Sequence, residues 1–148
     1  MGMFDDEIQM IQSIEDEIPI VVRRTIEKFG FVLLDYITNK QLDQKGEDAL
    51  GQKLKPKYSL GYARIRVKKG LQIDHVDTHF SGKFHASLQI ETRENEFVIS
   101  STVDYDQYII GKYGIEIIKI QQQYLEDFVE KYLKPALIKM IDDKFTKS

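Results

Sequence analysis

The chain contains no cysteine among its 148 residues. It can therefore form neither a disulfide framework nor a thiolate-based site, which fits a reducing compartment. It also lacks any run near the ~20 apolar residues that a membrane-spanning helix needs, so we expect no membrane partner. The first residues are acidic, instead of basic and then apolar, so we expect no secretion signal.

Sequence motifs of common catalytic sites are missing as well. No Gly-x-Ser-x-Gly elbow surrounds any serine, and the glycines are too widely spaced for a phosphate-binding loop. The paired carboxylates Glu94/Glu96 and Asp104/Asp106 lie in predicted turns, where solvated acids are common. We therefore expect no enzymatic activity, no catalytic residue and no cofactor.

Histidine and aspartate gather in one short stretch, as Asp74, His75, Asp77, His79 and His85. Imidazole and carboxylate groups can hold a metal ion, and an extended segment 73–80 would place alternate residues on one face. Against this, the stretch is polar and flanked by glycine, and nothing in the sequence fixes the rings. We favour a solvated loop and expect no metal site.

The composition is that of an ordinary globular protein, with 42% hydrophobic and 30% charged residues. A chain of this length suits a single domain with a genuine core. We predict one domain over residues 1–148, with an acidic N-terminal helix or arm over 1–18 and an α+β core over 19–148. The formal net charge of −3 argues against a protein that coats nucleic acid with its whole surface.

Helical periodicity dominates the first third of the chain. Isoleucines recur at helical spacing from Ile8 to Ile18. Pro19 then interrupts the pattern, and because proline is best tolerated at the first position of a helix, we predict a second helix beginning there. An apolar stripe from Val22 to Ile37 belongs to that helix. The polar residues 38–48 predict a turn-rich connection.

The middle of the chain predicts an antiparallel hairpin. Apolar and polar residues alternate over 84–91, and a second β-rich run follows over 97–103. Residues 105–114 predict an aromatic-rich loop or short helix, and residues 124–145 a long amphipathic helix kinked at Pro135. The predicted fold class is α+β, an antiparallel sheet packed against an N-terminal helix and a long C-terminal amphipathic helix.

A basic stretch is the strongest local electrostatic signal. Residues 49–73 contain no acid and carry seven positive charges, on Lys53, Lys55, Lys57, Arg64, Arg66, Lys68 and Lys69. Alternation over 62–67 predicts a strand, and a short helix is the alternative because Tyr58, Tyr62 and Ile65 share a helical face.

This stretch has two functional interpretations. It can contact a phosphate backbone, with the tyrosines stacking on bases, or it can meet an acidic face of a neighbouring subunit. We favour the protein contact because the rest of the chain is acidic. The candidate interface comprises the seven basic residues and the N-terminal acids Asp5, Asp6, Glu7 and Glu15.

The order of several short motifs resembles one protein family. These motifs are residues 41–43 and 46–51, Tyr58-Ser59, Tyr62-Ala63, residues 68–70 and 81–87, Tyr113-Gly114 and the terminal amphipathic segment. The series resembles the small virion morphogenesis proteins of tailed bacteriophages and prophages, which include head–tail joining, neck and tail-completion (minor tail) proteins. The family's Thr-Gly-x-Leu/Phe-x-x-Ser element maps onto Ser81, Gly82, Phe84 and Ser87, with Ser81 in place of threonine.

The resemblance implies a structural subunit that forms a ring between the portal and the tail. Its expected partners are other copies of itself and phage portal, adaptor or tail proteins, with weak contact to DNA in a channel. It implies residence in the virion after synthesis in the bacterial host cytoplasm. Ser81, Gly82 and Gly114 are expected to form structural turns. The alternatives are a nucleic-acid-binding module that uses residues 53–69 and, third, a metal-dependent hydrolase that uses His75, His79 and His85.

Overall fold

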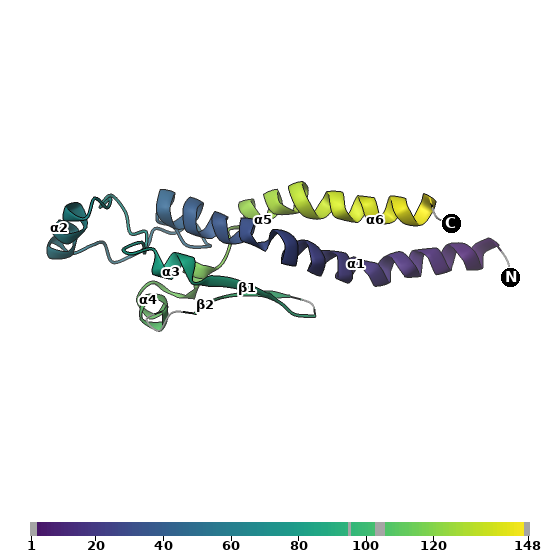
Figure 1. The fold of residues 1–148 in the computed structure, drawn as a ribbon, viewed down its shortest axis with the longest axis horizontal. Coiled ribbons are helices and arrows are strands. Elements are labelled where there is room, and N and C mark those ends of the chain that lie inside the picture. Colours follow the sequence, from purple (N-terminus) through teal and green to yellow (C-terminus); the bar gives the residue numbers. More distant parts are fainter. Residues whose placement is uncertain (1–2, 95, 103–105, 147–148) are drawn as a thin grey trace.

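Two long helical segments lie side by side along much of the molecule (Figure 1). The computed structural model describes residues 3–94, 96–102 and 106–146. The first segment is α1 (Met3–Asp35), which continues as the π-helical η1 (Tyr36–Lys45). The last comprises α5 (Gln122–Phe128), the π-helical η3 (Val129–Leu133) and α6 (Lys134–Thr146). The chain ends lie together at one end of the molecule (Figure 1).

The shorter elements lie between these helices in sequence. They are α2 (Leu60–Lys68), α3 (Lys83–Ala86), β1 (Leu88–Thr92), β2 (Phe97–Ser101), α4 (Asp106–Tyr113) and the 3₁₀ helix η2 (Ile115–Ile118). Helix α2 lies at the end of the molecule opposite the chain ends (Figure 1). Strands β1 and β2 pair antiparallel, with Leu88 opposite Ser101 and Thr92 opposite Phe97. The predicted α+β class and the hairpin are confirmed.

The hairpin packs against α1, and a glycine allows the close approach. A Cβ atom on Gly30 would lie 2.8 Å from Cγ2 of Ile90, closer than two carbon atoms can pack. Glycine inside a helix costs about 1 kcal/mol relative to alanine. In return, the absence of a side chain at Gly30 allows β1 to pack directly against α1.

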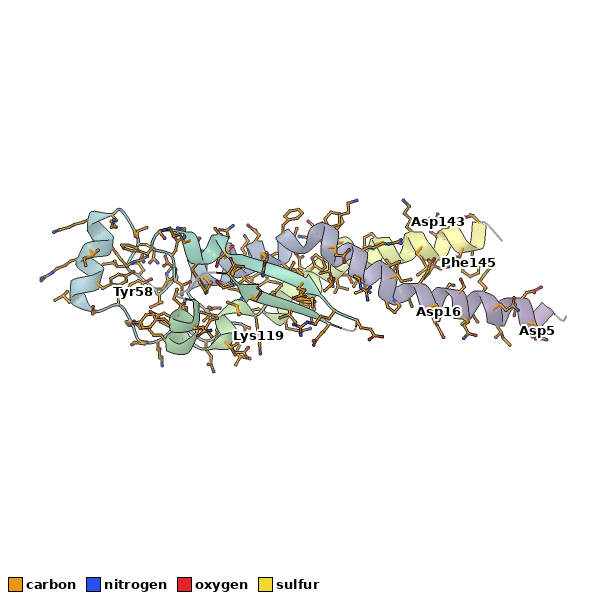
Figure 2. All side chains as sticks on the ribbon, turned by 60° about the horizontal axis from the view of Figure 1, so that its bottom comes forward. Asp5, Asp16, Tyr58, Lys119, Asp143 and Phe145 are labelled. Atoms are coloured by element: carbon orange, nitrogen blue, oxygen red, sulfur yellow. The ribbon has the colours of Figure 1, made fainter. Side chains whose placement is uncertain are left out.

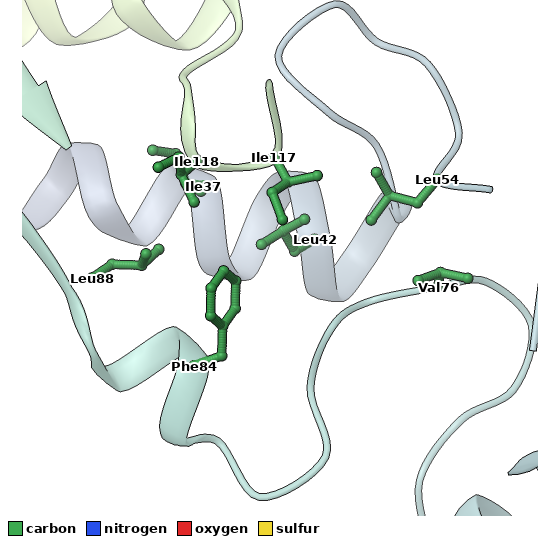
Figure 3. Packing of buried hydrophobic residues seen from close by; sticks show 8 residues of the cluster. All are labelled: Ile37, Leu42, Leu54, Val76, Phe84, Leu88, Ile117 and Ile118. Carbon is green, nitrogen blue, oxygen red and sulfur yellow. The ribbon is translucent and has the colours of Figure 1, made fainter. Parts of the chain in front are cut away.

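Two clusters of buried apolar side chains form the core. The larger one joins the end of the first helical segment to the loops and short elements (Figure 3), through Ile37, Leu42, Leu54, Val76, Phe84, Leu88, Ile117 and Ile118. The smaller one, with Ile26, Leu33 and Phe128, joins α1 to α5. Both clusters begin well after the first turns of α1, so the N-terminal part of that helix contributes nothing to them.

The prediction that Pro19 begins a second helix is wrong, because α1 runs through it without a break. A proline inside a helix removes one backbone donor and crowds the carbonyl four residues earlier. Pro19 is exposed, so water can reach the carbonyl that loses its partner. The predicted division between residues 18 and 19 therefore falls inside one helix.

The predicted turn-rich connection over residues 38–48 is helical as far as Lys45. Its inner face carries Ile37, Gln41 and Leu42, all completely buried, so a helix buries what a turn would expose. The helix ends at Gly46, whose φ of 61° is left-handed and whose N–H donates to the carbonyl of Leu42.

The basic segment is helical, so the predicted strand over residues 62–67 is wrong and the helical alternative is confirmed. Ser59 starts α2, since its hydroxyl accepts a hydrogen bond from the N–H of Tyr62 at 3.2 Å. The helix ends at Lys69, before Gly70 with its positive φ of 74°.

Two other boundaries differ from those predicted. The first strand begins at Leu88, because residues 83–86 form a helical turn instead. The aromatic segment adopts the helical alternative in α4, while Val103 and Tyr105 lie outside the described residues. Pro135, where a kink was predicted, lies in the first turn of α6, directly after the π-helical η3.

Within the described residues, no helix combines the length and apolar character needed to cross a membrane.

Candidate functional site

A buried arginine organises the loop that follows α2. Arg66 is 1% exposed, and its Nη2 donates to both carboxylate oxygens of Asp77 at 3.0 Å. Its Nε donates to the carbonyl of Gln72 at 2.9 Å, and its Nη1 donates to the carbonyl of His79 at 2.8 Å. The guanidinium also lies 4.4 Å from the ring centre of Tyr58. One side chain therefore fixes three points of the segment 72–79.

The prediction that Arg66 belongs to a subunit interface is consequently wrong. Its charge is matched inside the molecule by Asp77, whose side chain is 7% exposed. Tyr58 completes the network, donating its hydroxyl to Asp77 at 2.9 Å. Burial raises the pKa of Tyr58 well above its usual value. The spacing of Tyr58, Tyr62 and Arg66, four residues apart, is the sequence signal that a helix would turn this arginine inward.

The other six predicted basic residues lie exposed on and before α2. We call them the basic end: Lys53, Lys55, Lys57, Arg64, Lys68 and Lys69. Apolar side chains are exposed among them, namely Leu60, Ile65 and Val67 of the same helix. The short helix thus presents positive charge and apolar surface together.

The predicted acidic residues lie at the opposite end of the molecule. Figure 2 shows Asp5 and Asp16 on the projecting part of α1, far from Tyr58 near α2. We call residues 4–24 of α1 the acidic arm, since no residue in this range is buried and no basic residue precedes Arg23. Its acids are Asp5, Asp6, Glu7, Glu15, Asp16 and Glu17.

The acidic arm also carries an apolar stripe that faces solvent. Phe4, Ile8 and Ile11 are 72%, 59% and 56% exposed, and their spacing places them on one side of the helix. The arm contacts α6 along its other side, where Lys144 Nζ donates to Ser13 Oγ at 2.5 Å and lies 3.6 Å from Glu17 Oε1. Pairing with α6 therefore leaves the stripe uncovered.

A cleft of about 530 Å³ lies between α2, α3 and α4. Aromatic rings line it, including Tyr62, Phe80 and Tyr108, and Lys83 and Lys112 stand among them. An apolar side chain with acidic neighbours would find both apolar contact and opposite charge here. The cleft lies next to the basic end, since Tyr62 and Arg66 of α2 contribute to its lining.

A second feature near the same loop is a cluster of one carboxylate and two imidazoles. Asp43 comes from η1, His79 from the loop after α2 and His85 from α3. Oδ1 of Asp43 lies 3.3 Å from Nδ1 of His79 and 3.5 Å from Nδ1 of His85. The two imidazole ring centres are 4.9 Å apart, in an edge-on arrangement.

The backbone holds the His85 ring in place. Its Nε2 lies 2.9 Å from the carbonyl oxygen of Asp77 and 3.0 Å from Oγ1 of Thr78. Since a carbonyl can only accept, Nε2 carries the hydrogen and Nδ1 faces Asp43. Burial lowers the pKa of His85, which favours its neutral form. Thr78 itself has a φ of 58°, a conformation that costs a non-glycine residue about 1–2 kcal/mol.

The histidine rings are therefore held in place by the fold, and are not the loosely placed rings of a solvated loop. The residues that meet also differ from the predicted set of histidines and aspartates. Asp77 is committed to Arg66, and His75 places Nε2 2.6 Å from the backbone oxygen of Asp43. Asp43 was missed because it precedes His79 by 36 residues and lies in a segment predicted as a turn. Only the tertiary fold brings them together.

The predicted turns at Ser81, Gly82 and Gly114 are present. Gly82 and Gly114 have positive φ values of 83° and 94°, which favour glycine. Ser81 Oγ accepts a hydrogen bond from the N–H of Lys83 at 3.3 Å. The turn leads into α3 and not directly into the predicted strand.

The hydroxyl of Ser87, the last residue of the sequence element that begins at Ser81, donates to the carbonyl of Phe84 and lies 2.6 Å from Oγ of Ser101. Comparison of the chain with family models, curated proteins and solved structures found no match.

Proposed function

We propose that the protein is a structural subunit of a tailed-phage or prophage virion, a head–tail connector, neck or tail-completion protein, whose copies associate end to end. In this arrangement the acidic arm of one copy contacts the basic end and the adjoining cleft of the next. The observation that carries the proposal is the opposite charge of two exposed faces, each with unpaired apolar side chains, at opposite ends of one molecule.

The apolar stripe supports association because its exposure to water is unfavourable in an isolated molecule. Exposed apolar surface that gathers in a patch, instead of being scattered, is typical of an interaction site. Phe4, Ile8 and Ile11 form such a patch on a helix that projects beyond the core. Covering them in a neighbouring molecule would add apolar burial of about 25 cal/mol for each Å² removed from water.

Charge fixes the direction of the contact. The acids of the arm would repel a second acidic arm and attract Arg64, Lys68 and Lys69 of another copy. A contact between two different faces is heterologous, and repetition of it gives a ring when the rotation closes. This is the assembly geometry that a connector requires.

The motif series described above supports the virion assignment. It implies contacts with portal, adaptor or tail proteins in addition to contacts between copies, and residence in the virion. Because the acidic arm and the basic end are both helical and exposed, either can also serve such a heterologous partner.

The experiment is sedimentation velocity of the full chain at increasing concentration, with negative-stain imaging of the associated fraction. Wild type is expected to associate and to form closed rings at high concentration. Triple reversal at the basic end (R64E, K68E, K69E) is expected to leave a monomer. A matched control reverses Lys28, Lys40 and Lys139, which are exposed outside both faces, and is expected to behave as wild type.

The association of the triple variant at wild-type concentrations would contradict the proposal. The competing function, nucleic-acid binding by the basic end, gives a different result in the same variants. There the affinity for duplex DNA would fall with log salt at a slope of about −0.9 per phosphate contacted, and the triple variant would lose DNA binding without a change in association state.

A further inference from the structure

We propose that Asp43, His79 and His85 form a binding site for one divalent first-row transition-metal ion of the Zn²⁺ type. This inference concerns the histidine cluster alone and is independent of the assembly faces proposed above. It stands on four observations: the distances between the donor atoms, the convergence of two imidazole nitrogens on one carboxylate oxygen, the residues that hold the ligands and the nature of the donors.

The distances match those of a metal site. In a tetrahedral zinc site with bonds of about 2.0–2.1 Å, neighbouring ligand atoms lie roughly 3.3–3.4 Å apart. Oδ1 of Asp43 lies 3.3 Å from Nδ1 of His79 and 3.5 Å from Nδ1 of His85. One donor atom of each of the three residues lies within 4.8 Å of the others. Little rearrangement is therefore needed for one ion to reach all three.

Two imidazole nitrogens converge on one carboxylate oxygen in the cluster. Nε2 of His85 lies 2.9 Å from the carbonyl oxygen of Asp77, so the other ring nitrogen, Nδ1, is directed at Oδ1 of Asp43. Nδ1 of His79 lies close to the same carboxylate oxygen. One bound cation would join all three atoms.

Each ligand is held by a neighbour that does not itself enter the cluster. His75 contacts the backbone oxygen of Asp43 through Nε2, Arg66 donates to the backbone oxygen of His79, and the Asp77 carbonyl orients the His85 ring. Metal-binding histidines usually donate their second ring nitrogen to a carbonyl or carboxylate in this way. The residues of the buried ion pair, Arg66 and Asp77, therefore position two of the three ligands, His79 and His85.

The donor set selects the class of ion. Two imidazole nitrogens and one carboxylate oxygen suit Zn²⁺ and neighbouring transition ions, whereas Mg²⁺ and Ca²⁺ prefer oxygen donors throughout. The His79 and Asp43 side chains are 38% and 31% exposed, and the His85 side chain is 8% exposed. Solvent therefore reaches the cluster from one side, and a water molecule would complete four-coordination.

A bound ion would join three distant parts of the chain, the end of η1, the loop after α2 and the start of α3. Asp43 and His85 lie on either side of the excursion of residues 47–82, which carries the basic end, and His79 lies within it. The ion would stabilise this excursion in the folded state and would be absent from the unfolded chain, so folding and binding would be linked.

The test is isothermal titration of the untagged full chain with Zn²⁺, since an affinity tag of histidines would bind the metal itself. We expect one ion per chain, no binding of Mg²⁺ or Ca²⁺, and visible absorption bands of four-coordinate Co²⁺ when Co²⁺ replaces Zn²⁺. A hundredfold excess of Zn²⁺ over its Kd is expected to raise Tm by roughly 5–10 °C.

Asp43→Asn and His79→Gln are the decisive variants, because both side chains are part-exposed and their replacement should leave the apo fold intact, which circular dichroism checks. Each is expected to abolish Zn²⁺ binding and the Tm rise. Asp74→Asn, an exposed aspartate on the same loop, is the matched control and should bind as wild type. Absence of stoichiometric Zn²⁺ binding, or binding that survives both decisive variants, would overturn the proposal.

Discussion

The loop region around Arg66 and the acidic arm differ in which side chains they bury and which they expose. Around Arg66, charged and polar groups are buried and paired inside the chain, and among the described residues no buried side-chain nitrogen or oxygen lacks a hydrogen-bond partner. Along the acidic arm, apolar groups are exposed and charges of one sign accumulate. The polar groups of the first region are paired within the monomer, whereas the apolar stripe of the second is left exposed by the arm's contact with α6.

The largest expected effect is in the buried network. Replacing Arg66 by methionine leaves the Asp77 carboxylate buried without its counter-charge, which costs about 3–5 kcal/mol of unfolding free energy. Arg66→Lys should lose less, since it keeps the charge but not the fork that reaches Asp77, Gln72 and His79. Urea unfolding measures both. A loss of less than about 1 kcal/mol of unfolding free energy in the Arg66→Met variant would contradict the buried pairing of Arg66 with Asp77.

Alkaline pH is expected to weaken the same network. Burial raises the pKa of Tyr58 in the folded protein, so its contribution is fully present below the unfolded pKa of about 10 and is lost as the pH rises above it. Tyr58→Phe should cost about 1–3 kcal/mol near neutral pH and should reduce the loss of stability above about pH 10. Equal pH profiles for the two proteins would contradict this assignment.

The smallest expected effect on stability is in the acidic arm. Ile8→Ser with Ile11→Ser should change the unfolding free energy of the monomer by less than about 0.5 kcal/mol, since both side chains are already solvated. The same double variant should reduce association at a given concentration. Leu33→Ala, at a fully buried position of α1, is the contrasting control and should cost about 2–5 kcal/mol.

The sequence was sufficient for features that depend on local periodicity. The helical character of the first and last segments, the hairpin and the turns at Gly82 and Gly114 follow from apolar spacing and glycine chemistry. It was insufficient where a neighbour far along the chain decides the structure. Residues 38–45 are helical because Gln41 is buried against the segment of Lys119 and Gln121.

The same contrast between local pattern and distant neighbours applies to the candidate functional residues. Charge composition identified the exposed lysines of the basic end and the acids of the arm, since surface charge is visible in sequence. It misplaced Arg66, whose environment depends on Asp77, and it could not join Asp43 to His79 and His85, because three separate segments meet there. The sign of a side-chain charge can be read from the sequence, whereas the burial of that side chain depends on the fold.

The most direct test of end-to-end association is complementation between two charge-swapped variants. One variant reverses five of the six acids of the arm, with D5K, D6K, E7K, E15K and D16K, and the other reverses five of the six positive charges of the basic end, with K55E, K57E, R64E, K68E and K69E. Each variant alone has two faces of like charge and should remain monomeric, whereas their equimolar mixture restores opposite charges at every contact and should associate. A mixture that stays monomeric while wild type associates, or a single variant that associates as wild type does, would contradict the account.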